Sequence, residues 1–189
     1  MSKHQIKKEH LTTNWAGGKT TELYIYPEDS HYKTGDFLFR ISTASIEIEE
    51  SVFTQLPEVE RTLMVLEGQV KLIHKNHHTK VLKPLDSDQF LGEWETNSVG
   101  KCIDFNLMCK SGTKGKVKGY NYKENTEHSI KLDGKINFIF LYKGLIEFND
   151  TRLTDSDLLI IKSESLMNKL KALEQSQIVV IYITEVNLE

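Results

Sequence analysis

The sequence predicts an all-β fold, because short runs of β-branched and aromatic residues recur along the chain with turn residues between them. Its 189 residues include only three prolines, and many short strands with frequent turns are typical of β-sandwiches and barrels. One helix is predicted near 164–174, where apolar residues recur at a spacing of three to four behind Ser163, a capping residue. The predicted strands are 20–26, 37–48, 61–66, 70–74, 88–91, 101–109, 128–132, 136–142, 145–148, 157–161 and 178–184.

A loose internal repeat refines this fold class. The segment 61–73, RTLMVLEGQVKLI, resembles 137–148, NFIFLYKGLIEF, and Gly68 and Gly144 supply the positive φ that a tight hairpin needs. Each copy is followed by a phrase in which an aspartate precedes another apolar strand, LDSDQFLGE or LTDSDLLIIKSE. This order is that of a cupin-type jelly-roll half, so two copies indicate a bicupin, with two jelly-roll-like β-barrel halves packed as one unit. Chance similarity between two hairpins explains the repeat about equally well.

The repeat also predicts the domain organisation. Residues 1–110 form the first cupin-like half, with a Trp- and Gly-rich entry segment, residues 111–127 a connector, and residues 128–189 the second half. The stretch 110–123 has five lysines and two tyrosines, which fits either a phosphate-binding patch with stacking rings or a solvated connector. The small net charge of −3 favours the connector, and it gives no support for nucleic acid or an anionic membrane as a partner.

Targeting and cysteine content predict a cytoplasmic protein with reduced thiols. No apolar run approaches the roughly 20 residues of a membrane span, and the basic N-terminal segment has no apolar stretch behind it. Cys102 and Cys109 are too few for a disulfide framework. On one extended strand they are roughly 23 Å apart with opposite-facing side chains, so they cannot bridge each other.

The segment 101–110, KCIDFNLMCK, places polar residues where a strand is usually apolar. Because strand side chains alternate, Asp104 and Asn106 share one face with Cys102 and Met108, while the other face is apolar. A buried acid and a buried amide need hydrogen-bond partners. They either close a structural network or face a polar cavity.

Two further segments carry candidate ligand-binding residues. In 14–22, NWAGGKTTE, the paired glycines allow close approach of a ligand, form an anion nest, or make a structural turn, which the pattern favours. In the strand 37–48, Arg40 and Ser42 share a face, and such an arginine either binds a carboxylate or pairs with Asp104. Arg61 opens the next strand, and alone it is typical of a solvated strand edge.

The sequence predicts no metal, no cofactor and no catalytic residue. A cupin metal site uses two histidines one residue apart on a strand, whereas His77 and His78 are adjacent in KNHHTK, which is predicted to be a hairpin loop. Acidic pairs such as Asp86 and Asp88 lie in turn-like surroundings and are expected to be solvated or to form turns. No serine stands in a nucleophile elbow, and neither cysteine has a histidine close by in the sequence.

Four segments together resemble the HutD/Ves family, which is associated with bacterial histidine utilisation and stress. They are NWAGGKTTEL (14–23), FLFRISTASIE (37–47), SVFTQLPEVERTLMVLEG (51–68) and GKCIDFNLM (100–108). The resemblance implies a metal-free bicupin that is non-catalytic or of unsettled activity, binds a small histidine-pathway metabolite and tempers the pathway. It also implies one pocket, whose ligand-binding residues are Trp15, Gly17, Gly18, Thr20, Arg40, Ser42, Arg61, Asp104 and Asn106.

Three hypotheses for this pocket follow. The first is a binding module for a small polar or carboxylated metabolite, with Arg40 and Arg61 as anion partners and Asp104 and Asn106 orienting the ligand. The second is a metal-independent enzyme with Asp104 as general acid or base. The third is a structural network that binds nothing. A homodimer through the apolar strand 178–184 is also considered, but this strand is equally suited to a central position.

Overall fold

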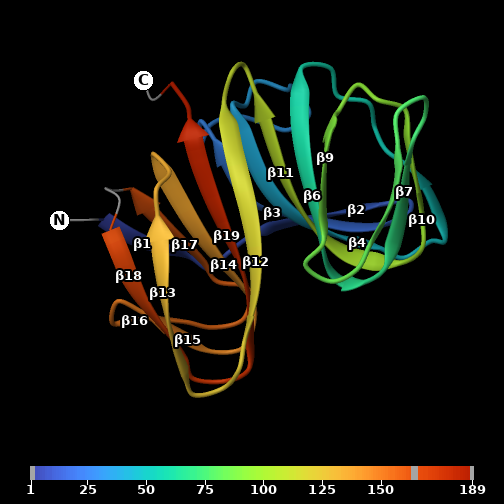
Figure 1. The fold of residues 1–189 in the computed structure, drawn as a ribbon. Helices are drawn as coiled ribbons and strands as arrows, with labels where there is room; N and C mark the ends of the chain where they lie inside the picture. The colour runs from blue at the N-terminus through green and yellow to red at the C-terminus, as the bar shows by residue number, and fades with distance from the viewer. Residues whose placement is uncertain (1–2, 163–165, 188–189) are drawn as a thin grey trace. The chain divides into compact units, whose positions relative to one another are not determined.

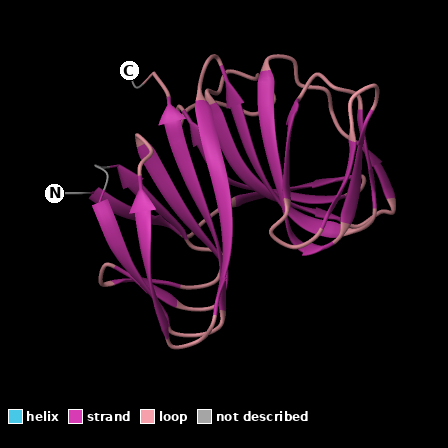
Figure 2. Cartoon of the chain, in the orientation of Figure 1, coloured by secondary structure: helices cyan, strands magenta, loops and turns pink. Residues whose placement is uncertain are grey.

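The computed structural model describes residues 3–162 and 166–187. Every regular element in these ranges is a β-strand (Figure 2), and no described segment forms a helix that is long and apolar enough to cross a membrane. The predicted all-β class is therefore confirmed. By internal contacts the chain divides into two compact units: His10–Thr113, and a unit made of Met1–Glu9 together with Lys114–Glu189 (Figure 1).

The His10–Thr113 unit contains two antiparallel sheets. The six-stranded sheet has the order β2-β3-β4-β11-β6-β9 and the four-stranded sheet the order β5-β10-β7-β8. The strands of the larger sheet are β2 (Leu11–Trp15), β3 (Gly18–Tyr26), β4 (Phe39–Ile46), β11 (Cys102–Lys110), β6 (Val59–Gly68) and β9 (Ser87–Leu91). Those of the smaller sheet are β5 (Glu50–Val52), β10 (Thr96–Val99), β7 (Val70–His74) and β8 (Thr79–Leu82).

An apolar core joins these two sheets. Leu63 and Val65 of β6 pack in one buried cluster with Leu72 of β7 and Leu82 of β8, and each of the four is fully buried. Alternation along each strand brings these residues to the face between the sheets. Burial of each such side chain contributes about 1.5–3 kcal/mol, so this cluster holds the two sheets together.

The other unit has the same two-sheet plan. Its five-stranded sheet, β1-β17-β14-β19-β12, faces a four-stranded sheet, β13-β18-β15-β16, across a core that includes Phe148, Leu159 and Val180. The larger sheet consists of β1 (Lys3–Lys7), β17 (Leu158–Lys162), β14 (Ile136–Lys143), β19 (Ser176–Glu185) and β12 (Lys114–Tyr122). The smaller consists of β13 (Thr126–Leu132), β18 (Leu166–Ala172), β15 (Ile146–Phe148) and β16 (Thr151–Leu153).

The predicted helix near 164–174 is wrong. Residues 166–172 form β18, which pairs with both β13 and β15, while 163–165 lie outside the described residues. In this strand Asn168, Leu170 and Ala172 are buried and Met167 is exposed, which is the period of two of a strand. An isolated helix of three turns is marginal in water, so pairing on both edges of this segment decides its structure.

The predicted connector 111–127 is also wrong over most of its length. Residues 114–122 form β12, a nine-residue strand that pairs with β19, and β13 begins at Thr126. The first residues differ from the prediction as well, because β1 pairs with β17 in the second unit. β19 lies between β14 and β12, which confirms the central position considered for 178–184 and leaves it no free edge.

Candidate ligand-binding site

A cavity of about 420 Å³ opens in the His10–Thr113 unit, on the face of the six-stranded sheet that turns toward the four-stranded sheet. Five of the six strands of the larger sheet contribute to its wall, together with β5 and the segments around Tyr32 and Phe53. The predicted site residues that line this cavity are Trp15, Thr20, Arg40, Ser42, Arg61, Asp104 and Asn106.

Strand register explains why these residues meet. Residues directly opposite each other in an antiparallel pair point to the same face. On β4 and β11, Ser42 lies opposite Asn106 and Ala44 lies opposite Asp104. Met108 lies between Arg40 on one neighbouring strand and Arg61 on the other. The polar face predicted for 101–110 is thus aligned with the polar face of 37–48.

Two β-bulges shape the wall of the cavity. One shifts the register between β3 and β4 after Glu22, and the other shifts the register between β11 and β6 next to Asp104. A bulge inserts one extra residue and so changes which side chains face inward. Beyond the first bulge, Ile25 lies opposite Arg40, so both Glu22 and Ile25 lie opposite cavity-lining residues of β4.

Arg61 begins a buried chain of polar side chains. Its guanidinium donates from Nη2 to Oδ1 of Asn106 at 3.0 Å, and Nδ2 of Asn106 donates to Oδ1 of Asp104. Phe53 and Phe90 flank the guanidinium, with ring centroids 4.8 and 5.2 Å from its carbon. Arg61 is only 8% exposed, so the expectation of a solvated strand edge is wrong. Its buried Nε has no hydrogen-bond partner among the described residues.

Arg40 has a different partner from the one considered. Its Nε donates to Oε2 of Glu22 at 2.7 Å and its Nη1 donates to Oγ of Ser42 at 3.2 Å. The ring of Tyr32 lies 4.3 Å from the guanidinium carbon. An Arg40–Asp104 ion pair is therefore not formed, because Glu22 lies opposite Ser42 on the adjacent strand and is within direct reach.

The electrostatics of the cavity favour an anion. Burial raises the pKa of Asp104 to about 7, although the charge of Arg61 and the hydrogen bond from Asn106 act against this rise. Burial lowers the pKa of Arg61 to about 10, which still leaves it protonated at neutral pH. Glu22 balances the charge of Arg40, whereas half-ionised Asp104 balances that of Arg61 only in part. The site therefore carries net positive charge at and below neutral pH.

The Trp- and Gly-rich segment forms a tight hairpin beside the cavity. β2 ends at Trp15 and β3 begins at Gly18, which pair with each other across a two-residue turn. Gly18 has φ +153°, and a Cβ there would lie 1.8 Å from the carbonyl oxygen of Ser45. A Cβ on Gly17 would meet the ring of Trp15 at 2.1 Å. The two glycines do not line the cavity, but they allow the turn that places Trp15 against it.

Some residues around the cavity were missed from the sequence. Tyr32 lies in the segment between β3 and β4, Phe53 follows β5, and Glu22 belongs to a motif in which it was assigned no role. Asp88, which was expected to be solvated or to form a turn, is buried in β9 and contacts His74 and His78. Cys102 and Cys109 are free, as predicted, and both are buried.

Comparison with known proteins identifies the family. The family model named HutD matches residues 7–180. The chain belongs to the HutD family. A search of curated proteins finds no match to it. Among solved structures, the conserved protein of unknown function PA5104 from Pseudomonas aeruginosa is 18% identical, with a TM-score of 0.80, covering 97% of this chain and all of that one.

Two further structures support the predicted bicupin fold. HutD from Pseudomonas fluorescens is 17% identical, with a TM-score of 0.77 over 98% of this chain and 100% of its own. YhhW from Escherichia coli, a bacterial pirin, is 12% identical, with a TM-score of 0.72 over 99% of this chain and 100% of its own. At these identities the likeness shows the fold alone, and it confirms that this HutD-family chain is a bicupin.

Proposed function

We propose that the His10–Thr113 unit of this HutD-family protein binds a small metabolite that carries a carboxylate, and that binding regulates histidine utilisation. Arg61 is the principal anion partner, Arg40 the second, and Asp104 and Asn106 orient the polar groups of the ligand. Trp15 forms part of the wall. The name of the family supplies the link to histidine utilisation.

The observation that carries this proposal is the state of Arg61. It is a buried cation that donates to a neutral amide, and its Nε has no partner among the described residues. A buried charge without full compensation is costly, and a carboxylate accepts two parallel hydrogen bonds from a guanidinium. A carboxylated ligand in the cavity that Arg61 lines would therefore supply the counter-charge that the neutral amide of Asn106 and half-ionised Asp104 provide only in part.

The size and composition of the cavity agree with this ligand class. About 420 Å³ lies within the 300–1,000 Å³ that is typical of small-molecule pockets. A purely structural network would be sealed, whereas Arg40, Arg61 and Asp104 all border this space. The two arginines are close enough for the charge of Arg40 to lower the pKa of Arg61, so a ligand with two carboxylates would relieve their repulsion.

A thermal-shift screen with histidine, urocanate, formiminoglutamate and formylglutamate tests the proposal. At equal concentrations we expect the two dicarboxylates to stabilise the protein most, and a ligand at 100 times its own dissociation constant should add about 2.7 kcal/mol. Failure of all four to raise the melting temperature, at concentrations up to the solubility limit, would remove the support for a histidine-pathway ligand.

Three variants make the screen specific. Arg61→Gln removes the anion partner and should abolish the shift, while Arg152→Gln, on an exposed residue of the other unit, should keep it. Arg61→Gln changes the packing of a buried side chain as well as its charge. Ser42→Ala is therefore included as a milder test of the same cavity wall. It removes one hydroxyl beside Arg40 and should weaken binding without unfolding the protein.

An enzyme is the second candidate, and one observation favours it. Asp104 has a pKa of about 7, which suits a group that both accepts and donates a proton at neutral pH. The enzyme hypothesis predicts turnover of a bound ligand that Asp104→Asn abolishes while binding is retained. If the ligand is recovered unchanged after long incubation with the wild-type protein, the enzyme hypothesis fails and binding remains as the function.

A further inference from the structure

Three metal-ligating side chains converge at a second place in the His10–Thr113 unit. His74 ends β7, His78 lies in the loop just before β8, and Asp88 belongs to β9. Their ligating atoms lie within 4.8 Å of one another, and none of the three lines the cavity described above. We propose that these side chains bind a divalent transition-metal ion, with Zn²⁺ as the best fit.

The distances between the ligating atoms suit a zinc ion. Oδ2 of Asp88 lies 3.2 Å from Nε2 of His74 and 2.8 Å from Nε2 of His78. Zinc bonds to nitrogen and oxygen are about 2.0–2.2 Å long, which in a tetrahedron places neighbouring ligand atoms roughly 3.3 Å apart. Both distances from Asp88 are within a few tenths of an ångström of this value, and the ligating nitrogens of the two histidines lie within 4.8 Å of each other, so a closure of at most about 1.5 Å would bring all three atoms into coordination. Two imidazoles and a carboxylate are also among the ligand sets that zinc prefers.

The hydrogen bonds behind His74 direct its Nε2 toward this site. Oγ1 of Thr96 donates to the carbonyl oxygen of Trp94 at 3.3 Å and lies 2.8 Å from Nδ1 of His74. If the hydroxyl proton is used on Trp94, Nδ1 donates to Thr96 and Nε2 is the unprotonated nitrogen of the neutral ring. In the neutral ring, Nε2 then presents a lone pair to the carboxylate of Asp88. Either a proton or a metal cation has to lie between two such acceptors.

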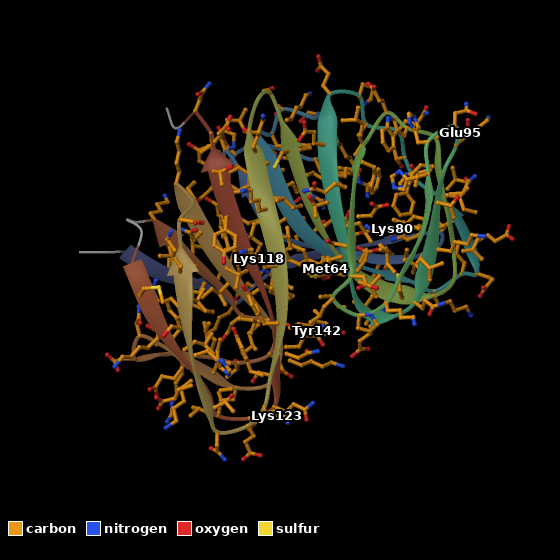
Figure 3. All side chains as sticks on the ribbon, in the orientation of Figure 1. Met64, Lys80, Glu95, Lys118, Lys123 and Tyr142 are labelled. Atoms are coloured by element: carbon orange, nitrogen blue, oxygen red, sulfur yellow. The ribbon has the colours of Figure 1, made fainter. Side chains whose placement is uncertain are left out.

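Asp88 is held in the same manner. Its Oδ1 accepts from the backbone N–H of Gln89 at 3.1 Å and lies 3.5 Å from Nζ of Lys80, which is labelled in Figure 3. Oδ2 therefore remains for the two histidines. Lys80 is half-exposed and also donates to the carbonyl oxygen of Ser87, so its amine can move away from the site when a metal ion brings its own charge. Such outer contacts orient ligands and raise metal affinity.

The site has an entrance. The side chain of His78 is 40% exposed, whereas those of His74 and Asp88 are almost completely buried. Three protein ligands with one side open to solvent leave room for a water molecule in the fourth position. A bound ion would tie the β7–β8 hairpin, at one edge of the four-stranded sheet, to β9 at an edge of the six-stranded sheet.

The adjacent histidine provides a matched control. His77 stacks on Trp94 with ring centroids 3.7 Å apart, and it does not belong to the cluster. We therefore compare wild-type protein with His78→Ala and His77→Ala, all without affinity tags. Titration with ZnCl₂ in a calorimeter gives the stoichiometry and affinity, and titration with CoCl₂ gives the absorption bands of a tetrahedral site.

We expect one Zn²⁺ per chain for the wild type and for His77→Ala, and an affinity at least about tenfold weaker for His78→Ala. Zn²⁺ should also raise the melting temperature of the wild type but not that of His78→Ala, whose circular dichroism spectrum checks that it is folded. The proposal is overturned if the wild type binds no stoichiometric zinc, or if His78→Ala binds it as tightly as the wild type does.

Discussion

Replacing Asp104 by Asn removes an ionisable group from the wall of the cavity and keeps an acceptor for the hydrogen bond from Asn106. Burial raises the pKa of Asp104 from its ordinary 3.8 to about 7. The stability contributed by the protonated form is therefore fully present below about pH 4 and is lost as the pH rises to about 7. At about 1.4 kcal/mol per pH unit, the wild type loses about 4 kcal/mol, of which about 3 kcal/mol falls between about pH 5 and pH 8.

Urea denaturation of the wild type and of Asp104→Asn at about pH 5 and about pH 8 measures this difference. Between about pH 5 and about pH 8, we expect the free energy of unfolding of the wild type to fall by about 3 kcal/mol more than that of the variant. Asp29→Asn, which removes one exposed carboxylate, controls for the change in net charge. Parallel pH profiles for wild type and Asp104→Asn would show that Asp104 is ionised without cost, and the electrostatic reasoning about the cavity would fail.

Three further predictions follow from the geometry. A carboxylate ligand should bind the wild type more tightly at about pH 6 than at about pH 8, because protonated Asp104 leaves Arg61 uncompensated; calorimetry at the two pH values should show an affinity ratio above one. Gly18→Ala should lower the free energy of unfolding by at least about 1–3 kcal/mol, because the added Cβ clashes with the backbone of Ser45. Gly112→Ala is the control, because an added Cβ there meets nothing within 4 Å and the variant should show the backbone strain alone. Equal destabilisation of the two variants in urea denaturation would contradict this prediction. Burial raises the pKa of both Cys102 and Cys109 to about 12, so iodoacetamide at about pH 8 should label neither in the native protein and both in urea, as mass spectrometry would record.

Much of the candidate site can be predicted because it lies on regular strands. The alternation in 101–110 predicts that Asp104 and Asn106 share a face, and that in 37–48 predicts the same for Arg40 and Ser42. The pairing register of the two strands then has to align only these two polar faces. The apolar residues on the opposite faces of both strands fix that register. The resemblance to the HutD family adds Trp15, the last residue of β2, and Arg61, which lies near the start of β6.

The rest depends on contacts that no local pattern encodes. Glu22 reaches Arg40 through a β-bulge, and Tyr32 and Phe53 come from irregular segments that contribute rings to the cavity. The histidine cluster joins a strand, a loop and a second sheet, so its spacing matches no short motif. The segment 166–172 has helical periodicity in its apolar residues, yet pairing on both edges makes it a strand.

The pairing of β1 with β17 has a consequence for how the protein can be divided. β1 precedes the His10–Thr113 unit in sequence but completes the sheet of the other unit, so the first unit is inserted between β1 and β12. Cutting the chain near residue 110 would separate β1 from its sheet and expose the hydrogen-bonding groups on the outer edge of β17. An exposed strand edge of this kind promotes aggregation. A fragment that begins at residue 114 would need the first nine residues fused to it before it could be soluble as an independent half.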